Sequence, residues 1–228
     1  MKIIPCIQSI ILAVVVTTSI PPSVFASEQH VAIPAVLTDM EKHTQEMIGS
    51  LLAKDGATSH KYFQQIKDDV KQLHEQMEAG RFNERRSREL LMTYSWMRVI
   101  GIEMSDKSWV GAAVAANQLS AMLVQTTHFP TLTRRDVAWL YYLGREVELL
   151  TMENPEANAD LLDVRLITLE NTWKRVRKEL IKDFRKKPLV EQGDALLKSL
   201  KQQPKQPAQI ISSAKKLLTF VQQLRNSI

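Results

Sequence analysis

Methionine and histidine side chains gather on one face of each of the first two predicted helices. Met40, His43 and Met47 are three and four residues apart, so one helix face carries all three. On the following helix, His74 and Met77 also share a face. Thioether sulfur and imidazole nitrogen together suit the soft ion Cu(I). These five residues are therefore the candidates for a metal site, with copper as the implied cofactor.

The pairing of these two helices decides whether the cluster converges. If the turn is centred near Gly56, an antiparallel hairpin places His74 near Thr38 and Met77 near Ala35, which is roughly one helical turn from Met40. His30, upstream, could fold over the same end. Methionine at helical spacing is more commonly core filling, and the histidine of the first helix has polar neighbours that suit solvent. The sequence leaves both a metal site and a structural role open for this cluster.

Positive charge is concentrated toward the C-terminal part of the sequence. Residues 170–228 hold 14 Lys and Arg against 5 Asp and Glu, whereas residues 27–169 hold 15 against 20. Such a patch suits an anionic partner or anionic lipid headgroups, and an ordinary solvated helix face is the alternative. The candidate residues for an anionic-partner face are Lys174, Arg175, Arg177, Lys178, Lys182 and Arg185.

Two neighbouring tyrosines are the candidates for the wall of a ligand groove. Tyr141 and Tyr142 point about 100° apart on a helix, so at least one of them leaves the core-facing stripe. An aromatic side chain at a groove edge can stack on a ligand, and it can equally cover the core while its hydroxyl group meets water. Trp173, on the next predicted helix, is expected in the core because of its spacing from Leu169 and Val176.

The sequence contains no recognisable catalytic set. It lacks the Glu-x-x-His pairs of di-iron bundles, the His-Glu-x-x-His of zinc proteases, a Gly-rich phosphate loop and Gly-x-Ser-x-Gly. Ser212 to Lys215 matches Ser-x-x-Lys, but the companion motifs are missing. An enzyme would need a cleft with perturbed carboxylates, for example around Glu146, Glu148 and Asp163. We therefore expect a non-enzymatic protein.

The first 26 residues are typical of a secretory signal. An apolar run over residues 3–20 is ended by Pro21-Pro22, and Val24-Phe25-Ala26 suits cleavage before Ser27. The run is shorter than the roughly 20 residues of a transmembrane anchor, which is the alternative. The single Cys, Cys6, would be lost with the signal, so we expect no disulfides. The sequence predicts a periplasmic or secreted protein, and export argues against a nucleic-acid partner.

Apolar residues recur three and four positions apart along almost the whole mature chain, which is the pattern of amphipathic helices. A composition of 44% hydrophobic and 24% charged residues is ordinary for a globular domain and excludes a disordered chain. The expected fold is all-α, an up-and-down antiparallel helical bundle array of about seven to eight helices. The expected helices cover residues 34–53, 58–79, 84–103, 106–126, 133–152, 155–184, 189–201 and 207–226.

Turn residues suggest where these helices begin and how they group. Thr58 and Asn83 are the expected N-caps of the second and third helices. A break at Phe129-Pro130 divides the mature chain into an N-terminal half-bundle, residues 27–128, and a C-terminal half-bundle with a basic tail, residues 129–228.

Two segments of the C-terminal half carry a resemblance to known proteins. Asp136 to Glu146 reads DVAWLYYLGRE, and Asn171 to Arg177 reads NTWKRVR. Over roughly the last 95 residues this pattern resembles a group of uncharacterised exported proteobacterial helical proteins, which implies an all-helical exported protein and no particular activity. The N-terminal half resembles, more distantly, exported four-helix cytochromes of the c-prime type. It has no Cys-x-x-Cys-His, so covalent haem is not expected.

Two functions remain in competition on these grounds. The first is an exported, non-enzymatic helical protein that binds a partner or a small ligand through a groove between helices or through the basic face. The alternative is a periplasmic protein that binds or senses copper through the Met/His cluster. A large apolar groove would favour the first function, and convergence of the sulfur and imidazole nitrogen atoms would favour the second.

Overall fold

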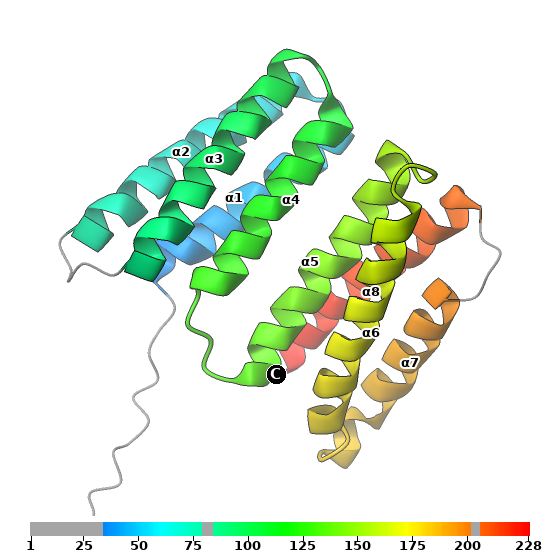
Figure 1. Cartoon of the computed structure of the whole chain (residues 1–228). Helices are drawn as coiled ribbons and strands as arrows, with labels where there is room; N and C mark the ends of the chain where they lie inside the picture. The colour runs from blue at the N-terminus through cyan, green and yellow to red at the C-terminus, as the bar shows by residue number, and fades with distance from the viewer. Residues whose placement is uncertain (1–33, 79–83, 202–205) are drawn as a thin grey trace, which may run out of the picture. The chain divides into compact units, whose positions relative to one another are not determined.

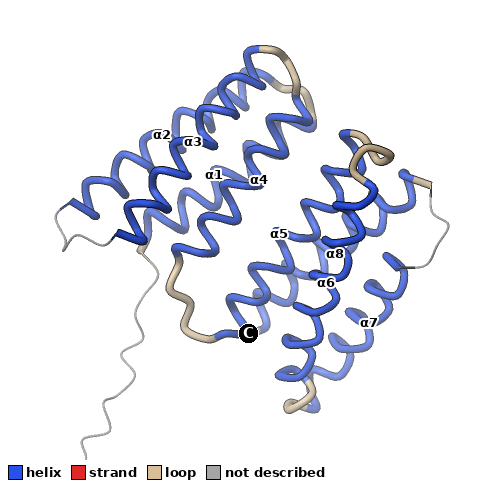
Figure 2. Tube along the Cα trace, in the orientation of Figure 1, coloured by secondary structure: helices blue, strands red, loops and turns tan. Residues whose placement is uncertain are grey.

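The computed structural model describes residues 34–78, 84–201 and 206–228, and all of them belong to one compact unit of the chain (Figure 1). These residues form eight α-helices and one short 3-10 helix, Phe184–Lys186, and they contain no strand (Figure 2). The all-α prediction is confirmed. The predicted signal peptide, His30 and the predicted N-cap Asn83 lie outside the described residues. The helices are α1 (Ala35–Leu52), α2 (Gly56–Glu78), α3 (Glu84–Ser105), α4 (Trp109–Thr126), α5 (Leu132–Glu153), α6 (Ala159–Leu180), α7 (Lys187–Lys201) and α8 (Pro207–Ser227).

The turn between α1 and α2 shows why α2 begins before the predicted cap. Asp55 Oδ1 accepts a hydrogen bond from the backbone N–H of Thr58 at 3.0 Å, so Asp55 is the N-cap residue. Hydrogen bonds from Thr58 hold the pKa of the Asp55 carboxyl below its usual value. Thr58, the predicted cap, therefore lies inside α2, which begins at Gly56.

Buried apolar side chains form two clusters. The first is built from α1 to α4 and receives Leu149 of α5, and the second is built from α5 to α8 and receives Ala121 of α4. Removal of these side chains from water is the main force that holds the helices together. The apolar stripes that predict α5 and α6 are buried except for Leu166, which is half-buried. The buried members are Val137, Leu140, Leu143, Val147 and Leu150 on α5, and Leu162, Leu169, Trp173, Val176 and Leu180 on α6.

Helices α4 and α5 join the two clusters. The buried residues Ala112, Ala113, Ala115 and Ala116 let α4 pack against α1, α3 and α5. Helix α5 packs in turn against α4, α6 and α8. Figure 1 shows the result: α4 and α5 lie side by side, α3 lies on α4, and α6 lies on α5. Helices α3 and α6 make no extensive contact with each other, so the surface between them stays open.

None of the helices in the described ranges combines the length and the hydropathy that a membrane crossing requires.

Candidate functional site

A trough lies over the α4–α5 pair, with α3 and α6 as its walls. It encloses about 570 Å³, which is within the size range of ligand sites in proteins. We call this surface the α4–α5 trough. Its lining includes Trp96 of α3, Gln118 of α4, Trp139 and Tyr142 of α5, and Arg165 and Arg175 of α6.

A partly buried hydrogen-bond network includes two residues of the trough floor, Gln118 and Tyr142. Gln118 Nε2 donates to Glu146 Oε1 at 3.1 Å, and the Tyr142 hydroxyl donates to Gln118 Oε1 at 3.2 Å. Burial, together with the neighbouring charge of Glu146, raises the pKa of Tyr142, so its hydroxyl stays protonated at neutral pH. Because each of the three side chains has a partner, the network orders this part of the floor without any ligand.

Arg165 contacts this network through its Nε atom, whereas its terminal amino groups have no partner in the described residues. Its Nε lies 2.7 Å from Oε2 of Glu146, which is only 2% exposed, in an ion pair whose angle does not suit a hydrogen bond. Its two terminal amino groups make no hydrogen bond with the described residues, although a guanidinium group has five N–H donors in total. Arg165 is therefore an anchored cation in the trough with donors left for a ligand.

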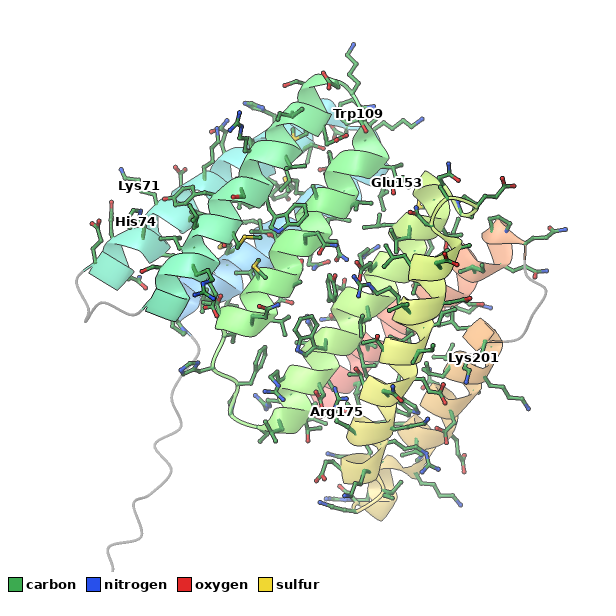
Figure 3. The ribbon with its side chains drawn as sticks, viewed as in Figure 1. Lys71, His74, Trp109, Glu153, Arg175 and Lys201 are labelled. Carbon is green, nitrogen blue, oxygen red and sulfur yellow. The ribbon has the colours of Figure 1, made fainter. Side chains whose placement is uncertain are left out.

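Most of the hydrogen-bond donors of Arg175, in contrast, already bind other residues of the protein. Its Nε and Nη2 donate to the two carboxylate oxygens of buried Asp136 at 2.8 and 2.9 Å, and Nη2 also approaches Thr172 Oγ1 at 3.3 Å. The hydrogen bonds with Asp136 raise the pKa of Arg175. Figure 3 labels Arg175 on α6, beside α5. This bidentate pair fixes α6 to α5 and gives the trough a rigid rim.

The two helices that flank the trough carry most of the exposed apolar side chains. Ten large hydrophobic side chains are exposed in the described residues, and eight of them belong to α3 and α6. These eight are Leu91, Met92, Tyr94, Val99 and Ile102 on α3, and Leu161, Val164 and Ile167 on α6. Exposed apolar groups gathered in this way mark interaction sites more often than scattered ones do.

Part of this exposed apolar surface continues directly from the trough lining. Met92 and Val99 lie four and three residues from Trp96, on the same face of α3. On α6, Val164 lies four residues before Thr168, which also lines the trough. Each wall therefore presents an apolar ridge beside the trough.

The two predicted groove tyrosines are separated by the structure. Tyr142 is buried, lines the trough and packs edge-on against Trp139 with ring centroids 5.4 Å apart. Tyr141 is absent from the trough lining. The guanidinium of Arg225 lies 4.6 Å from its ring centroid and that of Arg145 lies 5.9 Å away. Arg225 also pairs with Glu41 of α1 at 2.8 Å, so Tyr141 stands beside a contact between α8 and α1.

The predicted anionic-partner face is distributed over several ion pairs. Arg175 lies in the trough, whereas Lys174 pairs with Glu170 at 3.0 Å and Arg177 with Asp194 at 3.0 Å. Lys182 pairs with Glu179 at 2.6 Å and Arg185 with Asp183 at 3.1 Å. Lys178 makes no ion pair with the described residues. Five of the six candidate residues therefore have an acidic partner in the protein.

The Met/His candidates occupy different environments. Met40 and Met47 are fully buried in the first cluster. His43 Nδ1 lies 2.7 Å from Asp69 Oδ2, whereas His74 bonds Tyr94 and Glu78, both at 3.1 Å. The Met77 side chain lies outside the described residues. No group of three or more His, Cys, Asp or Glu side chains in the described part of the chain could hold a metal ion. The copper site stays a prediction.

The contact of His43 with Asp69 gives this histidine a measurable structural role. His43→Ala should lower the free energy of unfolding by about 1–3 kcal/mol, because it leaves the Asp69 carboxylate, 12% exposed, without its partner. His60→Ala is the matched control, since His60 is exposed and bonds only Gln64 among the described residues, so its loss should stay within about 0.5 kcal/mol. Urea denaturation measures both values. Equal losses for the two variants would contradict the role assigned to the pair.

Several residues of the trough were not predicted from the sequence. Arg165, Gln118 and Trp96 stand in no recognisable motif, and their proximity depends on three different helices. A signal was nevertheless present in α3 and α6. Both helices carry apolar residues outside their core-facing stripes, as Val99 and Val164 show, and a solvent-facing helix surface is normally polar.

Comparison with known proteins adds no assignment: no family model, curated protein sequence or solved structure matches this chain.

Proposed function

We propose that this protein is a non-enzymatic binding protein that takes an amphipathic helix of a partner protein into the α4–α5 trough. The carrying observation is the placement of the exposed apolar side chains: eight of ten in the described residues belong to α3 and α6, the helices that flank the trough, and Met92, Val99 and Val164 among them border its lining. The signal-like first 26 residues support a site of action in the periplasm or outside the cell.

The walls suit a helix better than they suit a small molecule. A small ligand would fill the floor around Trp139 and Tyr142 but would leave the ridges of α3 and α6 exposed. An amphipathic helix, bound by residues at i, i+3, i+4 and i+7, covers both ridges and the floor together. Met92 and Val99 on one wall and Val164 on the other would then lie against its apolar side chains.

The charges in the trough specify the polar part of the partner. Glu146 and Asp136 are both paired with arginines, so neither carboxylate repels an acidic group of the partner. Arg165 still has free donors on its terminal amino groups. An Asp or Glu at the border of the partner's apolar face would pair with them, and such a bond to a charged group is stronger than a neutral one. The expected partner helix is therefore apolar on one face and acidic beside it.

Two synthetic helical peptides of about 16 residues test this function. Both carry Leu at i, i+4 and i+7, and they differ by a single border residue, Glu in one and Lys in the other. The Glu peptide should bind with a dissociation constant in the micromolar range and at least tenfold more tightly than the Lys peptide, a difference of about 1.4 kcal/mol. Nuclear magnetic resonance should place the shift changes at the Trp96 indole and at Val164.

Variants of the protein provide the control. Val164→Asp puts a carboxylate into the apolar wall and should weaken the binding of the Glu peptide at least tenfold. Leu132→Asp changes a side chain that is also exposed but stands at the start of α5, on neither of the two helices that flank the trough, and should leave the affinity unchanged. The function would be rejected if neither peptide bound saturably, if both variants behaved alike, or if the shift changes lay away from the trough.

A further inference from the structure

A second groove, between α6 and α7, is built from two equivalent sets of residues. Each helix contributes an acid, an apolar residue, a lysine and a base at positions i, i+3, i+4 and i+7. The groove encloses about 550 Å³. The sets are Glu170, Trp173, Lys174 and Arg177 on α6, and Asp194, Leu197, Lys198 and Lys201 on α7.

The antiparallel arrangement of the two sets closes both ends of the groove. At one end Arg177 Nε pairs with Asp194 Oδ2 at 3.0 Å, and at the other end Lys201 Nζ pairs with Glu170 Oε2 at 2.6 Å. The Trp173 indole donates to Asp194 Oδ1 at 2.8 Å, which fixes that carboxylate further. Both carboxylates of the groove are therefore committed to partners on the opposite helix.

The middle of the groove keeps an excess of positive charge. Four cationic side chains line the groove against two carboxylates, so two positive charges remain uncompensated. Lys198 makes no ion pair with the described residues, and Lys174 shares Glu170 with Lys201. Hydrogen bonds from Lys201 and Lys174 hold the pKa of Glu170 below its usual value, so Glu170 stays ionised and its single charge is shared by two lysines.

We infer that the α6–α7 groove binds a small dianion of the phosphate-monoester class, held between Lys174 and Lys198. Lysine binds phosphate as a flexible point charge, and a phosphate monoester carries about −1.5 to −2 charges at neutral pH, which matches the excess in the groove. The ion pairs at both ends limit the ligand to a compact group rather than a long acidic peptide. This site is separate from the α4–α5 trough, since no residue lines both.

Phenyl phosphate is the probe for the site, and two charge variants decide the outcome. Phenyl phosphate should bind saturably, with shift changes in the amide and side-chain resonances of Lys174 and Lys198. Lys198→Gln should weaken binding at least tenfold. Lys178→Gln is the matched control, because it removes the same charge from an exposed lysine outside the groove and should change the affinity less than twofold. Equal effects of the two variants, or binding that does not saturate, would overturn the inference.

Vesicles distinguish the two sources of such a phosphate group. Cosedimentation with phosphatidic acid vesicles that is lost in Lys198→Gln, and absent with phosphatidylcholine, would assign the groove to a lipid headgroup. Binding of phenyl phosphate without cosedimentation would assign it to a soluble phosphate ester. Binding of a polyglutamate peptide without binding of either phosphate would refute the inference.

Discussion

Trp173→Ala is expected to lower the free energy of unfolding by about 3–5 kcal/mol, as the loss of a buried aromatic side chain usually does. Trp173 is 3% exposed, its ring lies edge-on to Phe220 with centroids 5.7 Å apart, and its indole N–H bonds Asp194. Truncation removes these contacts and leaves a cavity between α6, α7 and α8. Urea denaturation followed by circular dichroism measures the loss, and a value below about 1 kcal/mol would contradict the core role.

The glycine beneath this indole gives a sharper form of the same test. A Cβ atom built on Gly193 would overlap the Cζ2 and Cη2 atoms of Trp173. Gly193→Ala should therefore destabilise the protein by about 1–3 kcal/mol. Gly49→Ala is the matched control, because nothing lies within 4 Å of its added Cβ, and alanine in a helix is better than glycine by roughly 0.5–1 kcal/mol. The free energy of unfolding should fall in Gly193→Ala and rise in Gly49→Ala. A change of the same sign in both variants would refute the steric explanation.

Arg145→Met should lower the free energy of unfolding by about 3–5 kcal/mol, because it leaves a buried carboxylate without its charged partner. Glu148 is fully buried, and Arg145 Nη1 donates to its Oε2 at 2.6 Å. Lys215 remains 3.9 Å from the other carboxylate oxygen, which is too far for a hydrogen bond. Removal of one partner from a buried pair is strongly destabilising because the remaining charge stays out of water.

Two controls separate this charge effect from lost packing. The double variant Arg145→Met, Glu148→Leu removes both charges and should recover most of the lost stability. Lys182→Met breaks the exposed pair with Glu179 and should cost no more than about 1 kcal/mol. The explanation is wrong if the double variant is as unstable as Arg145→Met, or if Lys182→Met costs as much.

The helices themselves could be predicted from the sequence because their signal is local. The three-and-four spacing of residues such as Leu169, Trp173 and Val176 identifies both the helix and its buried face. The register of the first hairpin also follows from its turn. A hairpin centred near Gly56 brings position 43 opposite position 69, and these positions are joined in the His43–Asp69 pair.

The candidate sites could be predicted only in part, because they depend on which helices become neighbours. The sequence offers both Tyr141 and Tyr142 as groove candidates, and only Tyr142 lines the trough, where its neighbour Arg165 comes from another helix and stands in no motif. Arg175 was assigned to a basic face, yet its partner Asp136 lies 39 positions earlier in the chain. Helical periodicity identifies an inward face and does not say what that face meets.

The packing of α8 on α5 has a consequence for the order in which the protein folds. The first cluster draws its side chains from α1 to α4, with Leu149 as its one later member, so most of it can close before the C-terminal half of the chain has folded. The second cannot, because α6 and α7 separate α5 from α8 in the chain. Contacts between distant segments form late, and apolar surface that waits for them is prone to aggregation. The docking of Pro207–Ser227 therefore sets the moment at which α5 is finally shielded, and a chain truncated before this helix would leave the apolar face of α5 exposed.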